Sequence, residues 1–179
     1  MLNTLRKRLQ GEEGFTLIEL LVVILIIGIL AAIAIPSFLN QKGKGEDSAA
    51  KSSARSGQTA LETYYTDNQT YDCSAVPASG SWALGCDSGL HQIEGSLPSY
   101  STTSPTPGGD MVVTNNGANN ALGSGNPTSS TYRVAVASNP SGRIFWIDKS
   151  GTQVTRGCYV PAGASNGGCK NVANSYGTW

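Results

Sequence analysis

The feature that most constrains this chain is an apolar run near its start, from Phe15 to Ile35. Among its 21 residues only Thr16, Glu19 and Gly28 are not apolar. A helix of this length is about 31 Å long, which is enough to cross the hydrocarbon core of a bilayer. A secretory signal peptide has a shorter apolar core and a cleavage site of small residues. We therefore expect this run to be retained as a single membrane-spanning helix.

Glu19 is the residue of this run that most needs an explanation. A carboxylate inside a membrane helix costs about 2.5–3.5 kcal/mol on insertion scales, so it needs a partner. A cut just before Phe15 would create a positive amine four residues away, on the same chain or on a neighbouring helix. The alternative is that Glu19 lies near the membrane interface and reaches water. The residues alone leave both interpretations open.

The segment Gly14-Phe15-Thr16-Leu17-Ile18-Glu19-Leu20 resembles the prepilin peptidase site of type IV pilins and type II secretion pseudopilins. The resemblance continues to Pro36 and includes Gly28. It implies cleavage after Gly14, N-methylation of Phe15 by the same peptidase/methyltransferase, and assembly of the apolar helices into a filament core.

That family also suggests roles and partners for this chain. Glu19, Gly28 and Pro36 would serve assembly, and the stretch between Gly28 and Pro36 could unwind when subunits pack. The partners would be further copies of the chain, the peptidase, the pilus assembly machinery and the membrane. Phe15 as first mature residue, after a leader of 14 residues, resembles the type IVa group.

The chain divides by composition into a leader (1–14), a membrane and filament-core helix (15–36), an amphipathic continuation (37–66) and a head (67–179). The continuation carries a helical stripe of small and apolar residues, with steps of four, three, four and four: Ala50, Ala54, Gly57, Leu61 and Tyr65. Pro36 and the glycines at 28, 43 and 45 predict weak points in this long helix.

The head reads as an antiparallel meander, with strands at 132–136, 143–148 and 153–160 separated by turns at 138–142 and 149–151. Residues 101–131 include 24 that are Gly, Ser, Thr, Asn or Pro, which predicts an exposed, mobile loop. The expected fold class is therefore α+β, with a long N-terminal helix packed on a small sheet, as in pilins.

Four cysteines follow the apolar run: Cys73, Cys86, Cys158 and Cys169. An even number in a small extracytoplasmic head predicts two disulfides, and the nearest pairing is Cys73–Cys86 with Cys158–Cys169. The second loop resembles the disulfide-bounded C-terminal loop of many pilins. A zinc site and reduced thiols are the alternatives, although neither pair has the close spacing typical of zinc.

No catalytic motif accompanies these features, and His91 is the only histidine. We expect no enzyme, no cofactor and no metal. Residues 66–179 carry five basic and six acidic side chains, which gives no clear nucleic-acid site. The predicted function is a structural subunit of a type IV pilus, in the cytoplasmic membrane before assembly and at the cell surface afterwards. The alternative is a type II secretion pseudopilin. The major pseudopilins that this chain resembles usually bind calcium in an acidic loop near the C-terminus, and the acid-poor C-terminal region here offers few ligands for that ion.

Overall fold

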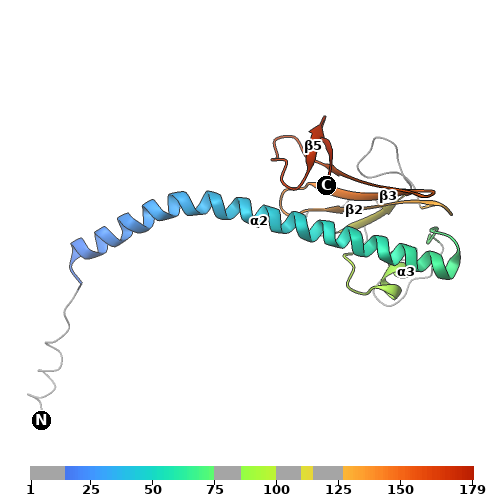
Figure 1. Cartoon of the computed structure of the whole chain (residues 1–179). Coiled ribbons are helices and arrows are strands. Elements are labelled where there is room, and N and C mark those ends of the chain that lie inside the picture. Colours follow the sequence, from blue (N-terminus) through green and yellow to red (C-terminus); the bar gives the residue numbers. More distant parts are fainter. Residues whose placement is uncertain (1–14, 75–85, 100–109, 115–126) are drawn as a thin grey trace, which may run out of the picture. The chain divides into compact units, whose positions relative to one another are not determined.

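The computed structural model of the chain describes residues 15–74, 86–99, 110–114 and 127–179. The expected leader and most of the 101–131 segment lie outside these ranges. The chain forms two compact units, one ending at Gln41 and the other running from Lys42 to Trp179. One long helix, α2 (Leu17–Asn68), contributes to both units (Figure 1).

The first part of α2 is long and apolar enough to cross a membrane. Pro36 lies inside this helix, and α2 also continues through Gly43 and Gly45. The helix is therefore continuous at these positions, and its local weakness stays a prediction. A proline removes only one backbone donor, and helices with a strong apolar context tolerate it. Unwinding between Gly28 and Pro36 on packing stays a prediction.

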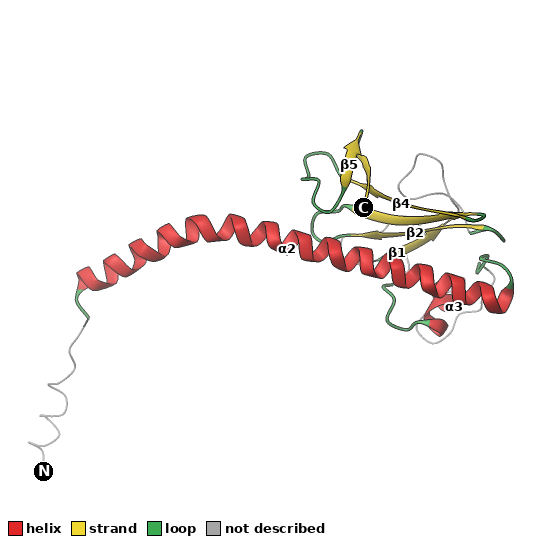
Figure 2. Cartoon of the chain, in the orientation of Figure 1, coloured by secondary structure: helices red, strands yellow, loops and turns green. Residues whose placement is uncertain are grey.

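The unit from Lys42 to Trp179 contains one antiparallel sheet in the order β1-β2-β3-β4-β6-β5 (Figure 2). The predicted meander is confirmed, within one or two residues at each end. The strands are β1 (Met111–Thr114), β2 (Thr131–Ala137), β3 (Ile144–Ser150), β4 (Gln153–Tyr159), β5 (Lys170–Ala173) and β6 (Tyr176–Thr178). The fold is α+β, as expected.

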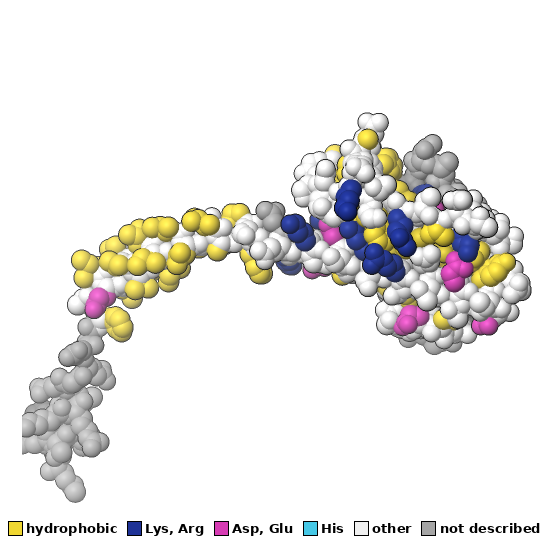
Figure 3. Space-filling view, in the orientation of Figure 1, with side chains coloured by type: hydrophobic (Ala, Val, Ile, Leu, Met, Phe, Trp, Pro, Cys, Tyr) yellow, Lys and Arg dark blue, Asp and Glu magenta, His cyan; other side chains and the backbone are white. Residues whose placement is uncertain are grey.

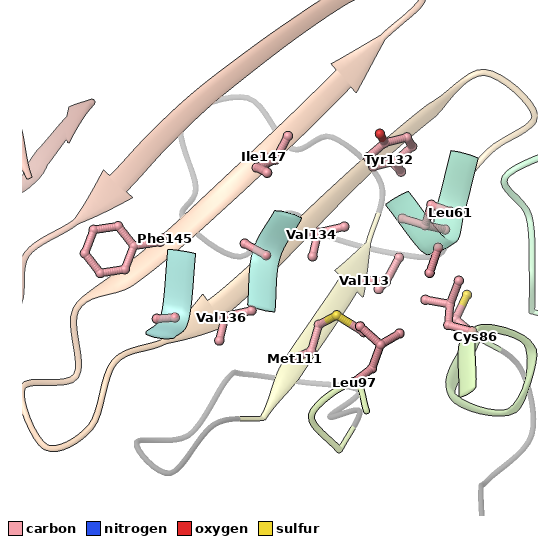
Figure 4. Packing of buried hydrophobic residues seen from close by; sticks show 14 of the residues in the cluster. Leu61, Cys86, Leu97, Met111, Val113, Tyr132, Val134, Val136, Phe145 and Ile147 are labelled. Atoms are coloured by element: carbon pink, nitrogen blue, oxygen red, sulfur yellow. The ribbon is translucent and has the colours of Figure 1, made fainter. Parts of the chain in front are cut away.

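The main core lies between this sheet and the second part of α2. Strand register places Met111, Val136, Phe145 and Cys158 in one row across the sheet, and all four are buried. Figure 4 shows the labelled strand side chains on the side of the sheet where Leu61 of α2 lies. The predicted stripe is confirmed, because Ala50, Ala54, Gly57 and Leu61 are buried and Tyr65 is half-buried.

The opposite face of the sheet carries a second, smaller cluster of Ala135, Ala137, Ile144 and Trp146, with Tyr159 packed against it. This explains why β3 is apolar on both faces, since each face meets its own cluster. A side chain at Gly157 of β4 would overlap the Trp146 indole, so the indole lies flat on that glycine.

Two elements were not predicted. Residues 101–131 contain the edge strand β1, whose four residues are all buried, so this segment is not a loop throughout. Its three apolar residues were hidden by the polar composition around them. The second is α3 (Cys86–Ile93), which carries buried Leu90 and His91, so His91 is not exposed. An imidazole nitrogen of His91 is 3.0 Å from the carbonyl of Leu97.

Two glycines of α2 offer a matched test of the packing. A Cβ at Gly57 would lie 2.6 Å from Met111 Sδ and 3.0 Å from Val134 Cγ1, whereas one at Gly45 meets no atom within 4 Å. Gly57→Leu should lower the free energy of unfolding by about 1–3 kcal/mol through overpacking. Gly45→Leu should raise it by up to about 1 kcal/mol, because glycine is a poor helix residue. Urea unfolding of the detergent-solubilised chain, followed by tryptophan fluorescence, measures both. Equal effects at the two positions would contradict the packing.

Candidate functional site

The start of α2 is closed by a reciprocal pair of hydrogen bonds between Thr16 and Glu19. The Thr16 backbone N–H and hydroxyl donate to Glu19 Oε2 at 2.8 and 2.6 Å, and the Glu19 N–H donates back to Thr16 Oγ1 at 3.3 Å. This is a capping box, in which a carboxylate at the third helical position satisfies donors at the helix start. We did not predict this box from the sequence, although the T-x-x-E spacing is its signature.

The capping box uses only one of the two oxygens of the Glu19 carboxylate. Both bonds from Thr16 reach Oε2, and within the described ranges no hydrogen bond to Oε1 is formed. One oxygen therefore caps the helix while the other keeps its lone pairs for a second donor. Gly14, the predicted cleavage position, lies outside the described residues, and the side chain of Phe15 is exposed.

The first part of α2 exposes apolar side chains over nearly its whole surface (Figure 3). One face is hollowed into an apolar groove lined by Leu21, Ile24, Leu25, Gly28, Ile29 and Ala32. Gly28 lies in this groove and lacks a side chain, so another helix can approach the backbone closely there. Pro36 lies two turns further along the same helix.

The structure joins the four cysteines as Cys73–Cys86 and Cys158–Cys169. The first bridge ties the segment after α2 to the start of α3. The second joins β4 to the residue before β5 and closes the C-terminal loop. All four cysteines are buried.

A buried carboxylate, Asp47 of α2, fastens the closed C-terminal loop to the helix and to the β2–β3 turn. Its Oδ1 accepts from Ser138 Oγ at 2.7 Å and pairs with Arg143 Nη2 at 2.9 Å. Its Oδ2 accepts from the Gly168 N–H at 2.7 Å. One turn further along α2, Lys51 Nζ donates to the carbonyl of Gly168 at 2.8 Å. Both backbone groups of Gly168 are thus held by α2.

A second polar cluster joins α2 to the sheet near the first disulfide. Glu62 accepts from the hydroxyls of Tyr132 at 2.7 Å and Tyr71 at 2.8 Å, and Lys149 Nζ lies 3.0 Å from its Oε1. Burial opposes ionisation of Glu62, but the bonds from Tyr132, Lys149 and Tyr71 hold its pKa below the ordinary value. Burial and the Glu62 carboxylate raise the pKa of Tyr132. The cluster is therefore an ionised structural network.

Asp148, the acid nearest the C-terminal region, forms an ion pair with Arg133 across β2 and β3. Both side chains are buried, so the Asp148 carboxylate serves to pair Arg133 within the sheet. Within the described ranges no three His, Cys, Asp or Glu side chains gather as metal ligands would.

Comparison with known proteins finds one family motif and several relatives that each match part of the chain. The prokaryotic N-terminal methylation motif matches residues 9–35. The chain is similar to the type IV major pilin protein PilA of Myxococcus xanthus, with 43% identity over 60 residues, which are 34% of this chain and 27% of that protein. It is similar to the type IV major fimbrial protein FimA of Dichelobacter nodosus, with 46% identity over 61 residues (34% and 38%).

The type II secretion system core protein G of Klebsiella michiganensis is also similar, with 39% identity over 64 residues, which are 36% of this chain and 45% of that protein. Each match thus spans less than half of these relatives. No solved structure matches the chain. The named relatives are pilins and a secretion-system protein, and each match covers 34–36% of this chain.

Proposed function

We propose that this chain, a member of the type IV pilin family by its N-terminal segment, is a structural subunit of a type IV pilus. The observation that carries the proposal is the start of α2. An exposed apolar helix, long enough to cross a membrane, begins with a single carboxylate inside the methylation motif. Such a helix is stable in a bilayer or inside a bundle of like helices, and the carboxylate needs a cation in either place.

The precursor is a single-pass protein of the cytoplasmic membrane, with the head on the side opposite the leader. Prepilin peptidase cuts after Gly14 and methylates the new amine of Phe15. Assembly machinery then moves the apolar helix from the bilayer into a filament. The chain does no chemistry of its own, and its role is structural.

The head suits the outside of a cell. Two disulfides tie the segment after α2 and the C-terminal loop, and three carboxylates, Asp47, Glu62 and Asp148, are paired with cations in structural networks. A head of this kind keeps its shape where neither chaperone nor reducing buffer is present.

Processing gives the direct test of the proposal. Mass spectrometry of the chain from sheared surface fibres should find Phe15 as first residue, with one added methyl group on its nitrogen. Gly14→Ala should leave uncut precursor in the membrane and reduce fibres strongly, because the peptidase of this family recognises that glycine. Surface protein that begins at Met1 would contradict the proposal.

The similarity to secretion core protein G favours one alternative, a pseudopilin within the cell envelope. The two functions differ in what deletion of the gene does. For a pilus subunit, deletion removes surface fibres and leaves secretion intact. Retention of secreted enzymes inside the cell, with this chain absent from sheared fibres, would establish the pseudopilin instead.

A further inference from the structure

Three cations lie around the indole of Trp179 on the head: Lys51, Arg55 and Arg156. Lys170 is close enough to Lys51 to lower its pKa, and we call these four side chains the basic surface. The Trp179 ring centroid lies 5.2 Å from Arg55 Cζ, 5.6 Å from Lys51 Nζ and 5.8 Å from Arg156 Cζ. Figure 3 shows Lys and Arg side chains gathered in one area of the visible face of the head. Trp179 is itself fixed, since its indole N–H donates to the carbonyl of Trp146 at 3.2 Å.

The positive charge of the basic surface is not neutralised within the described part of the chain. Arg55, Arg156 and Lys170 are exposed and form no ion pair there. Asp47, the carboxylate nearest to Lys51, is buried and taken by Arg143. Burial lowers the pKa of Lys51, Asp47 raises it, and the like charges of Lys170 and Arg55 lower it further. The cations therefore repel one another.

The far end of α2 carries the opposite charge, and we call it the acidic end: Asp67 and Asp72. Asp67 lies in the last turn of α2, which contains no basic residue. Helix carbonyls make that terminus partly negative, so a carboxylate there is unfavourable without an outside cation. Asp72 is close enough to raise the pKa of Tyr64, after the larger effect of burial.

We propose that the basic surface of one copy docks on the acidic end of a neighbouring copy in the filament. This rests on the proposed function, because it needs a polymer of parallel chains. In such a polymer every α2 has the same direction, and neighbours are shifted along it. Arg55 and Asp67 are about 18 Å apart along the helix axis, so a shift of that order brings opposite charges together. The contact relieves the repulsion on one head and brings cations to the acidic end of the other.

Charge exchange tests this contact in cells that express the full chain. Arg55→Glu with Arg156→Glu should reduce sheared fibres at least ten-fold, and Asp67→Lys with Asp72→Lys should do the same. The chain with all four changes should recover at least half of the fibres, because the charges are complementary again. The matched control, Arg55→Lys with Arg156→Lys, keeps the charge and should assemble normally.

Further measurements on each variant separate the outcomes. Each variant should keep its methylated Phe15, both disulfides and its urea midpoint in detergent, so that a folding or processing defect is recognised. No recovery in the four-fold variant would overturn the proposal. Normal fibres from Arg55→Glu with Arg156→Glu, with loss of binding to a short DNA duplex, would overturn it in favour of a polyanion site. Absence of the unaltered chain from sheared fibres would overturn the pilus function itself.

Discussion

Glu19→Val should abolish nearly all surface fibres while the precursor still inserts into the membrane and is still cut. Valine lengthens the apolar run, so insertion becomes easier. Assembly loses the only carboxylate of the apolar segment, and with it the partner of the Phe15 amine in a dry core. A charge pair worth about 3 kcal/mol to each contact corresponds to a factor of about one hundred. Counting of sheared fibres and of membrane-bound mature chain measures both effects.

The geometry at the start of α2 explains why one carboxylate can serve two purposes. Oε2 of Glu19 accepts both hydrogen bonds from Thr16, which closes the helix start. Cleavage before Phe15 leaves the Thr16 N–H in place and adds a charged amine next to it. Under the proposed processing the cap would keep its hydrogen bonds and leave Oε1 for that amine, of the same chain or of a neighbour.

Two control variants separate the cap from the charge. Thr16→Val removes the capping hydroxyl and keeps the carboxylate, so it should cost about 1 kcal/mol of helix stability and leave most fibres intact. Glu19→Gln keeps an acceptor and removes the charge, so it should assemble as poorly as Glu19→Val. If Glu19→Gln makes fibres in normal number while Thr16→Val does not, the carboxylate is only a helix cap.

The sequence predicted those parts of the fold that have a strong local signal. The apolar run, the stripe from Ala50 to Leu61 and the three strands of the meander each show a regular period or length. Strand β1 and helix α3 do not, because a strand of four residues and a helix of eight are too short for a period to emerge. Their positions are set by burial and by the Cys73–Cys86 bridge.

The polar networks could not be predicted from the sequence, for a related reason. Asp47 and Arg143 are 96 residues apart, and Glu62 and Lys149 are 87 apart. Only the fold brings them together, and no spacing rule connects them. The near balance of charge in the head likewise hid the basic surface, because five basic and six acidic side chains in total say nothing about where the charges lie.

Asp47→Ala should be the most destabilising single change in the head, with a loss of about 3–5 kcal/mol in the free energy of unfolding. The substitution leaves the Arg143 guanidinium buried without its carboxylate and removes the acceptor of the Gly168 N–H. It should also free the C-terminal loop, which α2 then holds only through Lys51. A loss of this size is a large part of the 5–15 kcal/mol typical of a domain.

Urea unfolding in detergent measures the loss, and hydrogen exchange at residues 161–168 measures the release of the loop. Glu46→Ala, one residue earlier on α2, is the matched control and should change stability by less than about 0.5 kcal/mol. Arg143 still donates to the carbonyl of Ser165 at 3.1 Å, so it keeps one partner in the variant. Combining Asp47→Ala with Arg143→Leu should therefore cost less than the sum of the two single changes, since the buried charge is removed together with its partner. An additive result would mean that Asp47 and Arg143 stabilise the head independently, and that the loop is fastened by the Cys158–Cys169 bridge instead.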